Sequence, residues 1–272
     1  MKIAQFYDKE YIQLGIIENN NLIPCDFKGE MIDFITTKST CKPSGSAIAL
    51  DSITLAPPVS SPSKIVAMGL NYKDHIRESR GEVPNSPLIF AKFPNSLIGH
   101  KDVITWDVNL TKKVDFEAEL AVVIGKKVHK CSETDAMEAI FGYTCANDVS
   151  ARDLQFGDGQ WVRGKSLDTF CPLGPWITTA DDIPDPHSLG IQCWLNGQIM
   201  QDSTTGMMVF KLPEIISFLS HNFTLLPGDI ILTGTPHGVG AFREPSIYMK
   251  DGDEIVVEID KIGKLMNVCH TL

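Results

Sequence analysis

One segment of the chain, residues 114–125, combines the pattern of a buried β-strand with three acidic residues, and it constrains the fold more than any other. Side chains alternate between the two faces of a strand, so one face carries only apolar residues, namely Phe116, Ala118, Leu120, Val122 and Ile124. The opposite face carries Asp115, Glu117 and Glu119, and then Ala121 and Val123. Such a strand needs apolar neighbours on one side and a special environment for its acids on the other.

The spacing of these acids has an energetic consequence. Neighbouring side chains on one face of a strand lie about 6.5–7 Å apart. Two full negative charges at that distance repel each other by about 2–2.5 kcal/mol at an effective dielectric constant of about 20. Water screens this repulsion on a solvated edge, whereas a half-buried strand needs a cation between the carboxylates. The pattern therefore has two interpretations, a divalent metal site and an acidic face exposed to solvent.

Length and composition limit the class of protein. The chain has 272 residues, 43% of them hydrophobic, which is enough for one large domain or for a large domain with a small one. The net charge is −10 and the basic residues form no run, which argues against nucleic acid or an anionic membrane as a partner. The seven cysteines are dispersed without a Cys-x-x-Cys pair, and the sequence shows neither a signal peptide nor a membrane-spanning run. We therefore expect reduced thiols in a soluble, cytoplasmic protein.

Turn signals divide the chain into a small N-terminal domain, residues 1–60, and a larger domain, residues 61–272. The first contains two strand-like segments and a short helical patch near residues 31–34, and a proline-rich linker over residues 56–63 follows it. In the larger domain, short apolar strands follow Pro-Gly and Asp-Gly turns.

Only two helices are expected in the larger domain. One begins at Ser132, which has capping-box spacing to Asp135, and ends at Gly142. The other runs from about Pro213 to Leu219. Because no alternation of strands and helices supports a parallel Rossmann sheet, the pattern predicts an α+β fold that is predominantly β.

Two further segments carry candidate functional side chains. His75 and Glu78 are three residues apart and share one face of a helical turn, where a carboxylate can orient an imidazole as a base for water. Asp148 follows a strand-like run, and Arg152 and Gln155 are again three apart, so that they can hold a carboxylate. The alternatives are a surface His–Glu pair, a helix cap and an ordinary salt bridge.

Together these segments resemble the fumarylacetoacetate hydrolase family from about residue 65 to the C-terminus. The resemblance rests on five ordered blocks: Gly69-Leu70-Asn71-Tyr72-x-x-His75-x-x-Glu78, Asp115-Phe116-Glu117-x-Glu119-Leu120, Asn147-Asp148-x-Ser150-x-Arg152-Asp153-x-Gln155, Arg163-Gly164-Lys165-Ser166 and Thr233-Gly234-Thr235-Pro236-x-Gly238-Val239-Gly240. It implies a mixed β-sandwich or β-roll with a small N-terminal domain. It also implies a homodimer that binds one Mg²⁺ or Mn²⁺ per subunit, since hard carboxylate oxygens suit these ions better than zinc.

The resemblance implies roles for individual residues. The metal ligands would be Glu117, Glu119 and Asp148. The catalytic residues would be His75, Glu78 and Lys165. The substrate-binding residues would be Arg152, Gln155 and Thr235. Asp115 has no role by this resemblance, beyond that of a partner to a neighbouring functional group.

The resemblance implies a divalent-metal-dependent hydrolase that cleaves a carbon–carbon bond in a 3-acylpyruvate-like 2,4-dioxo acid, such as fumarylpyruvate. The alternative is a decarboxylase or isomerase that acts on oxaloacetate-type or 2-hydroxy-dienedioate substrates through the same enolate. Asn71 stands where fumarylacetoacetases proper carry an acid, which argues against fumarylacetoacetate itself as the substrate. The chain is more similar to the bacterial-type branch of acylpyruvate hydrolases, decarboxylases and isomerases. A metal-stabilised binding protein without turnover is a hypothesis of a different class.

Overall fold

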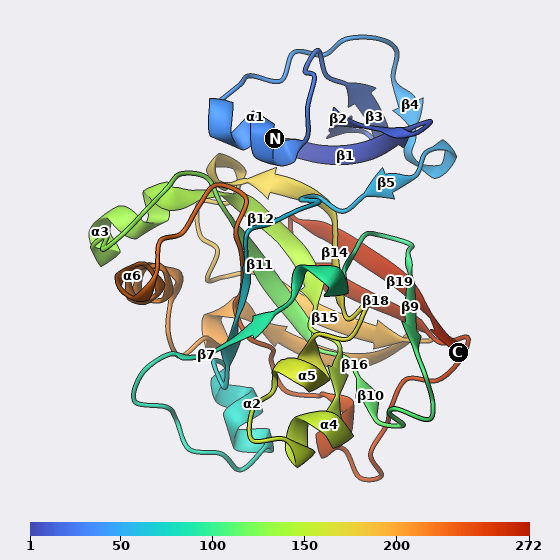
Figure 1. Ribbon diagram of the computed structural model, residues 1–272, viewed down its shortest axis with the longest axis vertical. Helices are drawn as coiled ribbons and strands as arrows, with labels where there is room; N and C mark the ends of the chain where they lie inside the picture. Colours follow the sequence, from blue (N-terminus) through green and yellow to red (C-terminus); the bar gives the residue numbers. More distant parts are fainter.

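The computed structural model describes residues 1–272, and most of its regular structure is β-strand (Figure 1). The main sheet has twelve strands. Ten of them follow one another in the order β4 (Ile48–Ala49), β3 (Asn21–Pro24), β2 (Tyr11–Glu18), β1 (Lys2–Asp8), β14 (Cys171–Thr179), β12 (Ile140–Asn147), β11 (Ala118–Ile124), β17 (Ile230–Leu232), β6 (Ile65–Gly69) and β7 (Leu88–Lys92). The other two are β5 (Leu55–Ala56), which pairs with β1, and β8 (Leu97–Ile98), which pairs with β14.

A second sheet and short helices complete the fold. The second sheet has the order β16 (Gln198–Thr204), β15 (Gly190–Leu195), β18 (Glu254–Ile259), β19 (Gly263–Thr271) and β9 (Val103–Trp106). A separate two-stranded pair consists of β10 (Val114–Asp115) and β13 (Ser150–Ala151). The α-helices are α1 (Met31–Thr37), α2 (Lys73–Glu78), α3 (Glu133–Ala136), α4 (Arg152–Gly157), α5 (Val162–Lys165) and α6 (Leu212–Asn222). This confirms the predicted class, a predominantly β protein with a few helices.

The two faces of β11 belong to two different cores, as the alternation in the sequence predicts. Val122 lies in the largest apolar cluster together with Val257 of the second sheet, and Val123 lies in another cluster together with Phe34 of α1. Every residue of β11 is buried, because β12 and β17 pair with its two edges. The strand is nevertheless interrupted: β10 ends at Asp115 and β11 begins at Ala118.

The predicted helix boundaries are correct at one end only. Ser132 caps α3, since its hydroxyl accepts a hydrogen bond from the backbone N–H of Asp135. The helical stretch ends at Ala139 and not at Gly142, because β12 begins at Ile140 and pairs there with β11. The second predicted helix, α6, is longer than the sequence indicates.

The expectation that all seven cysteines are reduced is wrong for two of them. Cys25 and Cys41 are joined in a disulfide, with their Cα atoms 5.5 Å apart. A backbone bridge between Cys25 and Pro43 brings the two chain segments together, and a contact of this kind leaves no signature in cysteine spacing. The other five cysteines are free.

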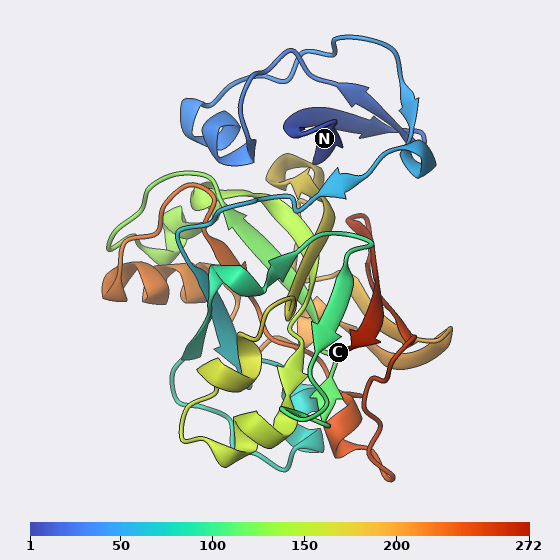
Figure 2. The ribbon, with the colours of Figure 1, turned by 45° about the vertical axis from the view of Figure 1, so that its right-hand side comes forward.

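The N-terminal strands and the helices α2, α4 and α5 lie at opposite ends of the molecule (Figures 1 and 2). β1 pairs with β14, so the N-terminal strands continue the main sheet. The proposed boundary near residue 60 remains a prediction. None of the helices is both long and apolar enough to cross a membrane.

Candidate active site

Three carboxylates from two adjacent strands meet at the end of the main sheet. Glu117 immediately precedes β11, Glu119 lies in it, and Asp148 follows β12. The two strands are antiparallel neighbours, and the backbone N–H of Asp148 donates a hydrogen bond to the carbonyl of Glu117 at 2.9 Å. Oxygen atoms of the three side chains lie within 4.8 Å of one another, and all three residues are buried. This burial rules out an acidic face exposed to solvent.

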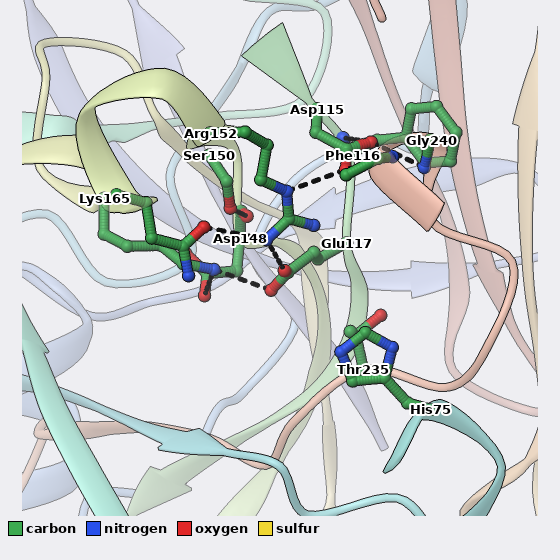
Figure 3. Close-up of polar contacts among 12 residues, drawn as sticks. His75, Asp115, Phe116, Glu117, Asp148, Ser150, Arg152, Lys165, Thr235 and Gly240 are labelled. Carbon is green, nitrogen blue, oxygen red and sulfur yellow. Dashed lines mark hydrogen bonds and ion pairs between the residues drawn. The ribbon is translucent and has the colours of Figure 1, made fainter. Parts of the chain in front are cut away.

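Two of these three carboxylates have cationic partners. The ammonium of Lys165 lies 2.7 Å from Oε2 of Glu117 and 2.7 Å from Oδ2 of Asp148. Nη1 of Arg152 lies 2.7 Å from Oε1 of Glu117, so both cations converge on this carboxylate (Figure 3). Glu119 has no such partner, and its carboxylate accepts a hydrogen bond from the backbone N–H of Gly234 at 2.7 Å.

The different surroundings shift the pKa values of the two glutamates in opposite directions. Burial alone would raise the pKa of Glu117, but the charges of Lys165 and Arg152 outweigh it and lower the pKa to about 2. Burial raises the pKa of Glu119 well above its ordinary value, and the negative charges of Asp148 and Glu117 raise it further. Glu119 is therefore the one carboxylate of the cluster that has no cationic partner in contact to offset its burial and the two negative charges beside it.

The set of donor atoms fits a hard divalent cation. It consists of carboxylate oxygens, and neither histidine nor cysteine belongs to the group. Oxygen ligands of this kind are typical of Mg²⁺, Mn²⁺ and Ca²⁺ sites. A dication next to Glu119 would supply the charge that Lys165 and Arg152 supply to Glu117.

Lys92 is a further cation of the site that sequence reasoning missed. Its ammonium is fully buried and lies 2.6 Å from Oδ1 of Asp148, and it also donates to the carbonyls of Val149 and Lys165. Lys92 and Lys165 therefore hold different oxygen atoms of Asp148. A single lysine at the end of an apolar strand gives no sign in the sequence that it faces another strand.

Asp115, for which the sequence offered no role, holds the guanidinium of Arg152. Its Oδ2 accepts from Nε of Arg152 at 2.8 Å, and its two oxygens also accept from the backbone N–H groups of Phe116, Gly240 and Ala241. Arg152 donates from Nη1 to Oε1 of Gln155 at 2.9 Å. Its Nη2 is buried and has no partner in the protein. One end of the guanidinium is thus a buried donor without an acceptor.

His75 and Glu78 form the predicted pair on α2. Nδ1 of His75 lies 3.3 Å from Oε2 of Glu78, and Oε1 of Glu78 accepts from the backbone N–H of Gly238 at 2.9 Å. Asp74 fastens the same helix to β16 and to the 233–240 loop, because its carboxylate contacts Ser203 at 2.5 Å and His237 at 3.0 Å. The histidine ring is buried, so the surface pair considered as the alternative is excluded.

Two residues of the family motifs are fixed by hydrogen bonds within the protein. The hydroxyl of Thr235 donates to the carbonyl of Ala118 at 2.9 Å and accepts from Gln201 at 2.8 Å, and its role in substrate binding stays a prediction. The amide of Asn71 is hydrogen-bonded to backbone groups of Phe210 and Thr233. Asn71 therefore fastens two loops together, and its side-chain amide is engaged by their backbone.

A cavity of about 80 Å³ joins these groups. The residues predicted from the sequence that line it are His75, Glu117, Glu119, Arg152, Gln155, Lys165 and Thr235. Glu78 and Asp148 lie behind this lining. Glu78 contacts His75, and Asp148 contacts Lys165. The site thus combines a carboxylate cluster, a free guanidinium N–H and an oriented imidazole around one small space.

A mostly β fold with buried carboxylates, a buried lysine and a His–Glu pair defines a class of enzymes, and comparison with known proteins gives the family. Residues 64–269 match the model of the fumarylacetoacetate (FAA) hydrolase C-terminal domain. The chain belongs to the fumarylacetoacetate hydrolase family. Its members include hydrolases, isomerases and tautomerases, as the names of its relatives show.

Particular relatives cover most of the chain. Oxaloacetate tautomerase Fahd2a, mitochondrial, of Rattus norvegicus is 50% identical over 216 residues, which are 79% of this chain and 69% of the relative. The fumarylacetoacetate hydrolase of Exiguobacterium antarcticum is 34% identical, with a TM-score of 0.91 over 100% of both chains. Maleylpyruvate hydrolase from Sphingobium is 31% identical, with a TM-score of 0.82 over 100% of both chains.

These relatives contradict the expected cytoplasmic location. The tautomerase of Rattus norvegicus and its counterparts in Bos taurus and Homo sapiens are mitochondrial proteins by name. The expectation rested on dispersed cysteines and on the lack of a secretory signal, and neither feature distinguishes the cytosol from an organelle.

Proposed function

We propose that this protein is a divalent-metal-dependent hydrolase of 3-acylpyruvate-like 2,4-dioxo acids. The observation that supports this most is the position of His75, which Glu78 orients and which lines the same small cavity as the carboxylate cluster and Arg152. Cleavage of a carbon–carbon bond by water needs a base, an anchor for the acid and stabilisation of a carbanion. The side chains around the cavity provide all three.

The pyruvoyl end of the substrate would bind at the polar wall of the cavity. The free Nη2 of Arg152 is available for the substrate carboxylate, and a charge-assisted hydrogen bond of this kind is stronger than a neutral one. Glu117, Glu119 and Asp148 would hold the dication, which supplies Lewis-acid polarisation of the 2-keto oxygen when bound. Burial alone would lower the pKa of Lys165, but Asp148 and Glu117 raise it, so its ammonium remains charged.

The proton transfers would proceed through His75. With its Nδ1–H directed at Glu78, the imidazole has Nε2 available as a base. Nε2 takes a proton from a water molecule, and the water oxygen attacks the distal carbonyl carbon. The bond to the pyruvoyl CH₂ carbon then breaks, and its electron pair remains as an enolate that the Lys165 ammonium stabilises. The proton on His75 returns to this carbon, which gives pyruvate and the carboxylic acid of the acyl group.

A second candidate function is tautomerisation or decarboxylation of oxaloacetate-type acids. The relatives that are 47–50% identical to this chain and are named oxaloacetate tautomerases favour it. The same residues are suited to it, because His75 can move a proton between carbon and the enol oxygen without activating water.

Assays with a panel of 2-oxo and 2,4-dioxo acids, in Mg²⁺ and in EDTA, test both candidates. Acetylpyruvate cleaved to pyruvate and acetate identifies a hydrolase, whereas loss of enol absorbance or release of CO₂ from oxaloacetate identifies the alternative. The His75→Ala variant should lose at least about 10²-fold in turnover while Mn²⁺ binding measured by calorimetry persists. The matched control is His270→Ala, since His270 forms a similar pair with Asp251 on the surface.

Three results would contradict the proposal. Unchanged turnover of His75→Ala would show that His75 is not the base. Full activity in EDTA would show that the reaction does not need a dication. Inactivity of the wild-type protein on every acid would revive the hypothesis of a binding protein without turnover. The expected homodimer is a separate proposal, which light scattering coupled to gel filtration would test.

A further inference from the structure

The cavity has a polar wall and an apolar wall. The apolar wall consists of Met68, Leu70, Phe90, Phe156, Trp161 and Phe242. A volume of about 80 Å³ corresponds to roughly five to eight water-sized positions when each needs about 10–15 Å³. The polar wall binds the reacting end of the substrate, so the apolar wall limits how far the remainder of the substrate can extend.

Trp161 is held in this wall by close packing. A Cβ atom added to Gly69, which ends β6, would lie 2.6 Å from Cζ3 of Trp161, so the indole packs directly against the backbone of the strand. The ring of Phe90 meets the indole edge to face at a centroid distance of 5.4 Å. Both contacts prevent the indole from moving away from the cavity without loss of packing.

The wall is also connected to the catalytic end. The ammonium of Lys165 lies 5.2 Å from the centroid of the Phe90 ring, and the same ammonium contacts Glu117 and Asp148. A continuous row of contacts therefore runs from the carboxylate cluster through Lys165 and Phe90 to Trp161. This row fixes the distance between the reacting end of the cavity and its far wall.

We infer that Trp161, packed on Gly69 and Phe90, is the residue that determines specificity and limits this enzyme to compact 2-oxo acids. The inference rests on the proposed function and narrows its substrate class. Acetylpyruvate and oxaloacetate fit this limit. Acids with a long or aromatic acyl group, including fumarylpyruvate, exceed it.

The test compares compact and bulky acids for each candidate reaction. Acetylpyruvate and benzoylpyruvate form the pair for hydrolysis, and the enols of oxaloacetate and phenylpyruvate form the pair for tautomerisation. The wild-type ratio of kcat/KM, compact over bulky, should be about 100 or more, and Trp161→Ala should lower this ratio at least about tenfold. Trp161→Phe should give an intermediate ratio, and Phe93→Ala is the control because Phe93 is exposed and lies outside the cavity.

A second variant changes the contact between Gly69 and Trp161 from the side of Gly69. Gly69→Ala places a methyl group against the indole and should push the ring into the cavity, which lowers kcat/KM even for the compact acid. In the Trp161→Ala background the same Gly69→Ala change should have little effect, because the clashing ring is gone.

Equal rates on compact and bulky acids in the wild-type protein, or an unchanged ratio in Trp161→Ala, would overturn the inference and leave the proposed function standing. Wild-type inactivity on all four acids would refute the proposed function, and the inference with it.

Discussion

Replacement of Asp115 by Asn tests whether the position of Arg152 determines substrate binding. Asp115 is fully buried and accepts four hydrogen bonds. Oδ1 accepts from Phe116 and Gly240, and Oδ2 accepts from Arg152 and Ala241. An Asn side chain has one oxygen, so in either orientation of its amide two N–H donors face an NH₂ group.

The size of the effect follows from these bonds. Each buried donor left without an acceptor costs about 1–3 kcal/mol, so Asp115→Asn should lower the free energy of unfolding by about 2–6 kcal/mol. With the NH₂ group turned toward Arg152, its guanidinium would be held by Glu117 and Gln155 alone. A displacement of the order of 1 Å should lower kcat/KM on the order of 10²-fold. Most of this loss should appear in KM, because in the proposed function Arg152 holds the substrate carboxylate before the reaction.

The assay combines urea denaturation with steady-state kinetics on acetylpyruvate or oxaloacetate. Asp229→Asn is the matched control, since Asp229 is equally buried and accepts bonds from Ser63, Lys64 and Leu226 away from the cavity. It should lose similar stability and keep its KM at temperatures where it is folded. A KM for Asp115→Asn that stays at the wild-type value would refute the reasoning, and Asp115 would then be only a structural residue.

Two further predictions concern stability. Lys92→Met should lower the free energy of unfolding by about 3–5 kcal/mol in urea denaturation, because it leaves Asp148 without one of its buried cations; wild-type stability would contradict the contact. Burial, and then the charge of Lys101, lowers the pKa of His100 to about 4, so the unfolded chain binds a proton there below about pH 6.5 and the folded protein does not. Stability should therefore fall by about 3 kcal/mol between pH 6.5 and 4, and less in His100→Asn; an equal fall in both proteins would refute this assignment.

The sequence was sufficient to predict the buried strand that follows the acids because the pattern is local. Alternation along residues 114–125 fixes which side chains share a face, and the apolar residues require burial on both sides of the strand. The convergence of Glu117 and Glu119 with Asp148 is not local, and it was predicted only through the family blocks. The antiparallel pairing of β11 with β12, which sets this geometry, depends on a connection whose helix was predicted too long.

Other features of the site could not be predicted, because they depend on contacts between distant segments. Asp115 is separated from Glu117 and Glu119 because β10 pairs with β13. This pair is only two residues long on each side, which is too short to be recognised in the sequence. Lys92 faces Asp148 because β7 lies at the edge of the sheet near the helices of the site, and its sequence is that of an ordinary strand end. The apolar wall depends on a close approach between Gly69 and Trp161, and a glycine in a strand does not indicate which side chain packs on it.

The charges of the site connect its acids to the substrate class. Four buried carboxylates, Asp115, Glu117, Glu119 and Asp148, face three buried cations, Lys92, Arg152 and Lys165, which leaves one negative charge when all are ionised. A pocket of this sign, in a chain of net charge −10, repels an anionic 2-oxo acid. A dication held by the three carboxylates would change the local charge from −1 to +1 and would make the same pocket attractive to that acid. In the proposed function the acids of the site would thus bind a cation first and the anionic substrate second, and the three buried basic residues offset enough of the repulsion among these acids for the protein to fold.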